Sequence, residues 1–297
     1  MTPARIVDAH VHFWSLGRPQ DHPWIAAAAA QDPESAFLRE DYLPATYLAD
    51  VAGLPVVGIV HVEAGWDRAR RLDETCWVEN LVRDVSFRVA LVTAAGLQQS
   101  AAAAELACQR SYKAVAGVRQ MLDWDPAPGA PQPPDLLGNP AWEAGLAAVA
   151  DLDLSFDLQV APEQLAAASE LVRRQPDVVF VLNHAGLRAP HSPEVDRLWD
   201  EGVQQLAALP NTRVKVSGYA SVDPSWDAEG FRHCTRRLVE LFGPERCCFA
   251  SNFPFDRATI SFPELVALHE WALDDLSPGE ADAYFAGTAI VTYGLGS

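Results

Sequence analysis

Val178-Val179-Phe180-Val181-Leu182 is the stretch that decides the fold. All five residues are apolar, so a strand here has two buried faces, as in a parallel sheet that helices cover on the outside. Seven other apolar, β-branched runs have a similar character. Segments with an apolar residue every three or four positions separate these runs, for example Val195, Trp199, Val203 and Leu206. Strict alternation of strand and helix predicts a parallel α/β sheet.

Eight strands fit a closed barrel better than an open sheet. We expect them at residues 5–14, 56–65, 87–96, 114–122, 154–161, 178–186, 212–220 and 247–255. Eight strand–helix units match the (β/α)8 TIM barrel, and 297 residues suit one such domain, which we expect to span residues 1–297. A doubly wound sheet is the alternative, but no strand-to-helix turn carries GxGxxG. The proline-rich segment 124–134 is interpreted as a loop.

Composition limits the partners. With 40 acidic and 22 basic residues the chain has a formal charge of −18, which repels nucleic acid and anionic membranes. Five cysteines without CxxC spacing indicate a reducing compartment. No apolar run approaches a membrane span, and no signal-peptide pattern precedes the first strand. We therefore expect a cytoplasmic protein that acts on a small molecule, with a homo-oligomer left open.

Polar residues recur where the predicted strands end, which is where TIM barrels carry their catalytic groups. They are His10 and His12 on the first strand, His61 and Glu63 on the second, Arg119 on the fourth, Asp157 and Gln159 on the fifth, His184 on the sixth, Lys215 and Ser217 on the seventh, and Asn252 on the eighth. The two-residue period of a strand places His10 and His12 on one face. Two imidazoles aimed at one point bind a metal or a developing oxyanion.

Each of these residues also has a purely structural interpretation. A single HxH occurs by chance in many proteins, and His61 is expected to lie deeper than Glu63 and to serve packing. Arg119 can pair with a surface carboxylate, and Glu63 or Asp157 can hold neighbouring arginines or histidines in place.

Aromatic residues follow several strand ends and together predict an aromatic-walled pocket for an organic ring, although core or lid packing is the better explanation for any one of them. The candidates for contact with a substrate are Trp14, Trp66, Trp124 and Phe253, together with the polar residues Glu63, Arg119, Gln159 and Ser217.

Seven motifs in chain order resemble the amidohydrolase-2 branch of the amidohydrolase superfamily, and within it the sugar-lactone and 2-pyrone-4,6-dicarboxylate lactonase group. They are Asp8-Ala9-His10-Val11-His12, Val62-Glu63-Ala64, Gly117-Val118-Arg119, Leu154-Ser155-Phe156-Asp157-Leu158, Asn183-His184-Ala185-Gly186, Val216-Ser217-Gly218 and Phe249-Ala250-Ser251-Asn252-Phe253-Pro254.

The resemblance implies a hydrolase of a small cyclic ester. His10, His12 and His184 would hold at most one divalent, zinc-type metal ion, or would polarise the substrate carbonyl without a metal. Arg119 would grip a carbonyl or carboxylate oxygen. The chain departs from the family pattern on strand five, which lacks a histidine, and at Gln120, where many lactonases have one.

The departure with the largest chemical consequence is Asn252, which stands where the family usually has an aspartate. An amide has no useful basicity, so another group must accept the proton of water. We expect Asn252 to position water or substrate. His184 is the expected base in a metal-free site, and Asp256 is the expected base if His184 binds a metal. Asp256 can also cap the following helix.

Three functions remain open. The first is a lactonase. The second is a metal-dependent decarboxylase of an aromatic or muconate-type acid, which needs no hydrolytic base on strand eight. The third is a barrel that binds a small ligand without turning it over. A gain of water, a loss of carbon dioxide and an unchanged ligand distinguish them.

Overall fold

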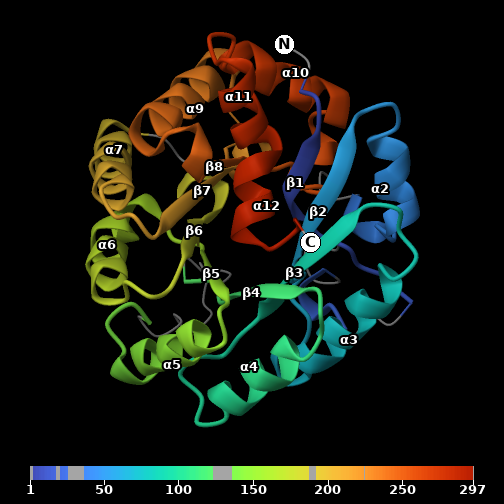
Figure 1. Ribbon diagram of the computed structural model, residues 1–297, viewed down its shortest axis with the longest axis vertical. Helices are drawn as coiled ribbons and strands as arrows, with labels where there is room; N and C mark the ends of the chain where they lie inside the picture. Colours follow the sequence, from blue (N-terminus) through green and yellow to red (C-terminus); the bar gives the residue numbers. More distant parts are fainter. Residues whose placement is uncertain are drawn as a thin grey trace.

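The computed structural model describes residues 3–17, 21–25, 37–122, 136–186, 192–223 and 225–296. One eight-stranded sheet forms its centre, with parallel neighbours in chain order and helices around the outside (Figure 1). The strands are β1 (Ile6–Val11), β2 (Val56–Val62), β3 (Arg88–Ala94), β4 (Val115–Arg119), β5 (Ser155–Leu158), β6 (Phe180–Leu182), β7 (Thr212–Val216) and β8 (Cys247–Phe249). The predicted (β/α)8 barrel is confirmed, and the doubly wound alternative is wrong. Trp124 and segment 124–134 lie outside the described residues.

The helices that cover the sheet begin at recognisable signals. Asn139, Ser192 and Asp227 cap three of them with side-chain oxygens that accept backbone N–H groups. The helices are α2 (Pro44–Asp50), α3 (Arg71–Leu81), α4 (Ala102–Arg110), α5 (Pro140–Asp151), α6 (Leu165–Arg174), α7 (Pro193–Ala207), α8 (Tyr219–Val222), α9 (Ala228–Phe242), α10 (Phe262–Ala272), α11 (Pro278–Asp282) and α12 (Thr288–Thr292). On α7 the predicted stripe buries Trp199, Val203 and Leu206.

Two apolar layers follow from the alternation of side chains along each strand. The larger layer joins outward residues of the strands, such as Phe156 and Phe180, to helix residues such as Trp142 and Leu165. A smaller layer fills the barrel interior with Val60, Val92, Val181 and similar residues, and Tyr293 and Leu295 from the end of the chain close it from below. Helix α12 lies across this end of the barrel (Figure 1).

The observed strands are shorter than the predicted ones because the polar residues at their ends belong to turns. On β6, for example, the strand ends at Leu182, and His184 and Ala185 adopt positive φ values of 52° and 54°. This conformation is uncommon for residues with a Cβ and is frequent at functional sites.

Asp8 closes the barrel between β1 and β8. Its carboxylate is fully buried and accepts hydrogen bonds from Ser251 N at 2.8 Å, Ser251 Oγ at 2.6 Å, His10 N at 3.2 Å and Tyr47 Oη at 3.1 Å. Burial raises its pKa to about 6, and these donors oppose that rise. Beside it, the backbone N–H of Asn252 donates to the carbonyl of His10 at 2.8 Å, and that of His12 donates to the carbonyl of Phe253 at 2.9 Å.

A second buried carboxylate lies inside the barrel. Asp157 and Lys215 form a fully buried ion pair at 2.5 Å, and Tyr293 Oη donates to the other oxygen of Asp157 at 2.8 Å.

In the part of the chain that the structure describes, no helix is both long and apolar enough to cross a membrane.

Asp8→Ala should lower the free energy of unfolding by about 3–5 kcal/mol, because several buried donors lose their acceptor at once. Denaturant titration would measure the loss. Asp282→Ala is the control, since Asp282 pairs with Arg5 at the surface and its removal should cost less than about 1 kcal/mol. Equal losses for the two variants would show that Asp8 does not hold the barrel closed.

Candidate active site

Three imidazoles meet above the interior layer of the barrel. A register shift between Asp8 and Val11 lets β1 turn both of its histidines toward one point, so that His10 Nε2 lies 3.1 Å from His12 Nε2. The ring of His184 lies 4.6 Å from the ring of His10, measured between centroids. The structure thus brings together residues from the first and sixth strands, 174 positions apart in the sequence.

The hydrogen bonds of His12 define its tautomer. Nδ1 lies 2.9 Å from the carbonyl oxygen of Val62, which can only accept, so Nδ1 carries the proton. Nε2 therefore has a lone pair, and neutral His10 donates to it from its own Nε2.

His184 is fixed by the turn after β7. Its Nδ1 lies 3.1 Å from Ser217 Oγ. Gly218 follows at φ +78°, and a Cβ at that position would lie 2.6 Å from His184 Nδ1. Residue 218 therefore has to be glycine for two reasons, namely its positive φ and the close approach of its backbone to the His184 ring.

All three imidazoles are neutral at physiological pH. Burial lowers the pKa of His10 and of His12 well below the usual value, and neighbouring positive charges, including those of Lys215 for His10 and Arg119 for His12, lower it further. Burial, with Arg119 and Lys215 as further causes, lowers the pKa of His184 to about 3. Neutral rings keep one lone pair and one N–H each, so they can donate or accept without first losing a proton.

Arg119 is held at the end of β4 by three groups. Nε donates to Glu63 Oε1 at 2.7 Å, Nη2 to the carbonyl of Glu63 at 2.9 Å and Nη1 to Gln159 Oε1 at 2.9 Å. A guanidinium has five N–H donors, and Nη2 also lies 2.7 Å from Glu63 Oε1, so one N–H, on Nη1, remains beyond these contacts with described residues. The pair realises the structural interpretation in which Glu63 holds a neighbouring cation, and the remaining N–H can still bind a substrate oxygen.

Sequence reasoning missed Glu74 of α3, which lies behind this ion pair. Its Oε1 accepts from Ala64 N at 2.6 Å, while Glu63 Oε2 accepts from Gly65 N at 2.9 Å. Burial, followed by the charge of Glu63, raises the pKa of Glu74 to about 8. The burial of Glu74 beside this ion pair could not be predicted, because nothing in the local sequence distinguishes it from a glutamate on the exposed face of a helix.

Asn252 and Asp256 form one polar network with the turn after β7. Asn252, at φ +58°, donates from Nδ2 to Ser221 Oγ at 2.9 Å and to Asp256 Oδ1 at 3.3 Å. Asp256 also accepts from Gly218 N at 3.2 Å and Ser221 N at 3.1 Å, so it caps α8, which precedes it in the chain, as well as contacting Asn252. Burial raises the pKa of Asp256 to about 6.

The other candidate residues lie in different surroundings. His61 stacks on Phe13 in the outer layer, and Trp66 is buried beside His22 and Trp77. Trp14 is fully buried but touches Phe255, whose ring meets that of His12 edge to face at 5.4 Å.

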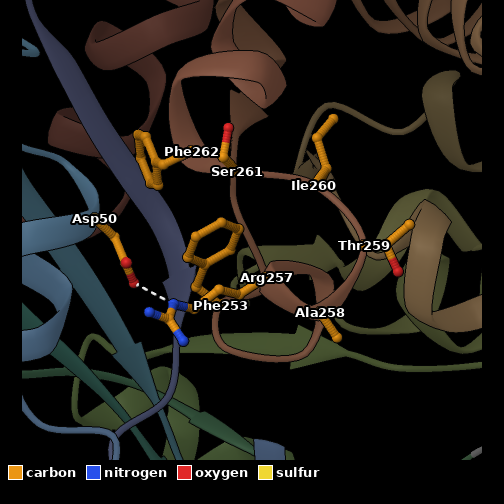
Figure 2. A pocket seen from close by; sticks show the side chains of 8 residues that line it. All are labelled: Asp50, Phe253, Arg257, Ala258, Thr259, Ile260, Ser261 and Phe262. Atoms are coloured by element: carbon orange, nitrogen blue, oxygen red, sulfur yellow. Dashed lines mark hydrogen bonds and ion pairs between the residues drawn. The ribbon is translucent and has the colours of Figure 1, made fainter. Parts of the chain in front are cut away.

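Phe253 is buried and lines a separate cavity of about 280 Å³ (Figure 2). None of the three imidazoles borders this cavity, whose other walls are Asp50, Arg257, Ala258, Thr259, Ile260, Ser261 and Phe262.

The histidines make an incomplete metal site. His10 and His12 present converging Nε2 atoms, but the described residues contain no group of three histidine, cysteine, aspartate or glutamate side chains arranged to hold a metal ion. Catalytic zinc normally has three protein ligands. A zinc-type ion therefore does not fit the described residues, and no step below depends on one.

The chain is similar to known proteins over nearly its whole length. A family model described as amidohydrolase matches residues 7–295. The L-fucono-1,5-lactonase of Burkholderia multivorans is 30% identical over 97% of this chain and 96% of its own. A crystal structure of an amidohydrolase from Burkholderia multivorans with bound zinc has 25% identity and a TM-score of 0.83, covering 98% of this chain and 99% of that one. A probable 2-pyrone-4,6-dicarboxylic acid hydrolase from Acinetobacter baumannii, at 16% identity over 97% of this chain and 99% of that one, shares the fold with a TM-score of 0.75.

Gly218→Ala should displace the His184 ring, whereas Gly294→Ala should not. Both glycines have positive φ, so both variants lose about 1 kcal/mol or more of stability. Only at Gly218 does the new Cβ meet an imidazole, since nothing lies within 4 Å of that position at Gly294. Imidazole ¹⁵N chemical shifts of His184 would report the displacement, and unchanged shifts in Gly218→Ala would contradict it.

Proposed function

The chain belongs to the amidohydrolase family, and on that premise we propose that it is a lactonase, which opens a small cyclic ester with water. The observation that carries the proposal is the meeting of three neutral imidazoles and Arg119 at the carboxyl ends of the barrel strands. The similarity to the L-fucono-1,5-lactonase, 30% identical over nearly the whole chain, supports it.

His184 and Arg119 polarise the lactone carbonyl in this proposal. Among the described residues the Ser217 hydroxyl contacts only His184 Nδ1, so we assign its proton to that bond. The proton of the neutral ring then lies on Nε2, from which it donates to the carbonyl oxygen. The remaining Nη1 N–H of Arg119 adds a charge-assisted donor. Donors aimed at the developing oxyanion each contribute about 10²–10³ in rate.

Asp256 takes the proton of the attacking water. Its pKa of about 6 is close to neutral pH, where a general base works best, whereas the pKa of His184, about 3, makes that ring a weak base. Among the described residues Oδ2 accepts one hydrogen bond, from Gly218 N, and keeps a lone pair. Asn252 holds Oδ1 and orients the water. This assignment replaces the sequence-based expectation that His184 is the base in a metal-free site.

The proton balance closes without another reactant. The water oxygen bonds to the carbonyl carbon as Asp256 accepts one proton, and a tetrahedral oxyanion forms. Its collapse breaks the ring C–O bond, and the departing alkoxide takes the proton back from Asp256. The product is an open hydroxy acid, and Asp256 returns to its carboxylate form.

A panel of five- and six-membered lactones should give products heavier by one water, measured by mass spectrometry. The same panel with a metal chelator should change turnover by less than about twofold, because the steps rest on protein groups. Loss of carbon dioxide from aromatic acids would support the decarboxylase instead. Activity that disappears with chelator and returns with zinc would contradict the metal-free mechanism.

Asp256→Asn should lower kcat by about 10²–10⁴-fold through loss of the base. In the unaltered enzyme kcat/KM should fall as pH drops through about 6, because the carboxylate that accepts the proton becomes protonated. That acidic limb should vanish in Asp256→Asn and persist in the control Asp200→Asn, a surface partner of Arg237. Collapse of activity in His184→Asn with little change in Asp256→Asn would return the role of base to His184.

A further inference from the structure

Phe255 is the centre of an aromatic cluster that no step of the mechanism uses. Its ring lies 5.9 Å from that of Trp24 at an interplanar angle of 19°, and 5.9 Å from that of Phe37 at 79°. Trp14, fully buried, supports it from 5.6 Å. Phe255, Trp24 and Phe37 are each half-buried, and we call these three residues the aromatic shelf.

The shelf is rigid at Trp24. The indole Nε1 donates to the carbonyl of Ala64 at 2.8 Å. Gly65, at φ +71°, lies so close that a Cβ there would come within 2.6 Å of the same nitrogen. Glycine at residue 65 leaves the space that the Trp24 indole occupies. The indole is thereby held nearly parallel to the Phe255 ring. A fixed aromatic face costs little entropy when a ligand stacks on it.

The shelf adjoins the reacting groups. Phe255 meets His12 edge to face at 5.4 Å and lies between Asn252 and Asp256 in the chain. Aromatic faces attract the C–H bonds and flat faces of rings, but they offer little to a flexible open chain of the same size. His12 also lies near Arg119 and His184, both of which lower its pKa, so this imidazole adjoins the shelf and the polar groups of the site alike.

From this arrangement we propose that the aromatic shelf is the subsite for the apolar face of the substrate ring. The inference rests on the proposed function and narrows it to rings with one face of C–H groups, with the carbonyl turned toward His184 and Arg119. The closed ring stacks on the shelf and binds there, whereas the opened hydroxy acid does not stack and dissociates. The shelf therefore determines KM and leaves kcat nearly unchanged.

Binding of δ-valerolactam, a six-membered ring that resists hydrolysis, tests the shelf separately from catalysis. Titration calorimetry should show weaker binding of the open-chain pentanamide than of the lactam. Phe255→Leu and Trp24→Leu should each raise the Kd of the lactam by about fivefold to tenfold and remove this preference. Phe255→Tyr, which keeps the ring, should restore it and rule out misfolding. Trp271→Leu, on α10 beneath Arg232, is the aromatic control and should bind as the unaltered protein does.

The outcomes separate the two proposals. If the lactam binds as described while no lactone is hydrolysed, the shelf stands and the lactonase proposal fails. If lactones are hydrolysed but Phe255→Leu and Trp24→Leu leave both the Kd of the lactam and KM within about twofold, the shelf proposal is wrong. It is equally wrong if the lactam shows no measurable binding to the unaltered protein.

Discussion

The closure of β1 against β8 is the constraint on which the site depends. The Asp8 carboxylate binds Ser251, and the backbones of His10 and His12 bond to residues 252 and 253. The same four bonds that seal the barrel therefore set where two imidazoles and Asn252 lie. The seam thus fixes the positions of the two imidazoles relative to Asn252, so fold and chemistry share one set of contacts.

The cations near the active-site histidines are opposite in sign to the net charge of the protein. The chain carries a large net negative charge, yet the buried cations that act on the imidazoles are Arg119 and Lys215, each paired with one carboxylate. Buried ion pairs seldom stabilise a fold by themselves. Burial is the main cause of the lowered pKa of these histidines, and the positive charges held here lower it further, which favours the neutral rings that the proposed chemistry needs.

The sequence predicted the barrel because apolar runs and helical stripes report burial directly, and it placed His10, His12, Arg119 and His184 at strand ends by position alone. It failed where the answer depends on backbone turns or distant packing. Positive φ at His184 and Asn252 redirects both side chains, and no periodicity reports this. Phe253 was expected to contact a substrate but is buried in the outer layer, whereas Phe255, two residues further on, joins Trp24, more than two hundred residues away.

The seam also has a consequence for synthesis on the ribosome. Asp8 can form its hydrogen bond with Ser251 only after residue 251 has been synthesised. The Asp157–Lys215 pair likewise gains its hydrogen bond from Tyr293 only near the end of synthesis. Until those late segments emerge, the edge of β1 that later meets β8 has no partner, and a carboxylate that is buried in the finished fold is still exposed. The nascent chain therefore carries one open strand edge through nearly its whole elongation, and the net negative charge of the chain keeps such chains apart by repulsion.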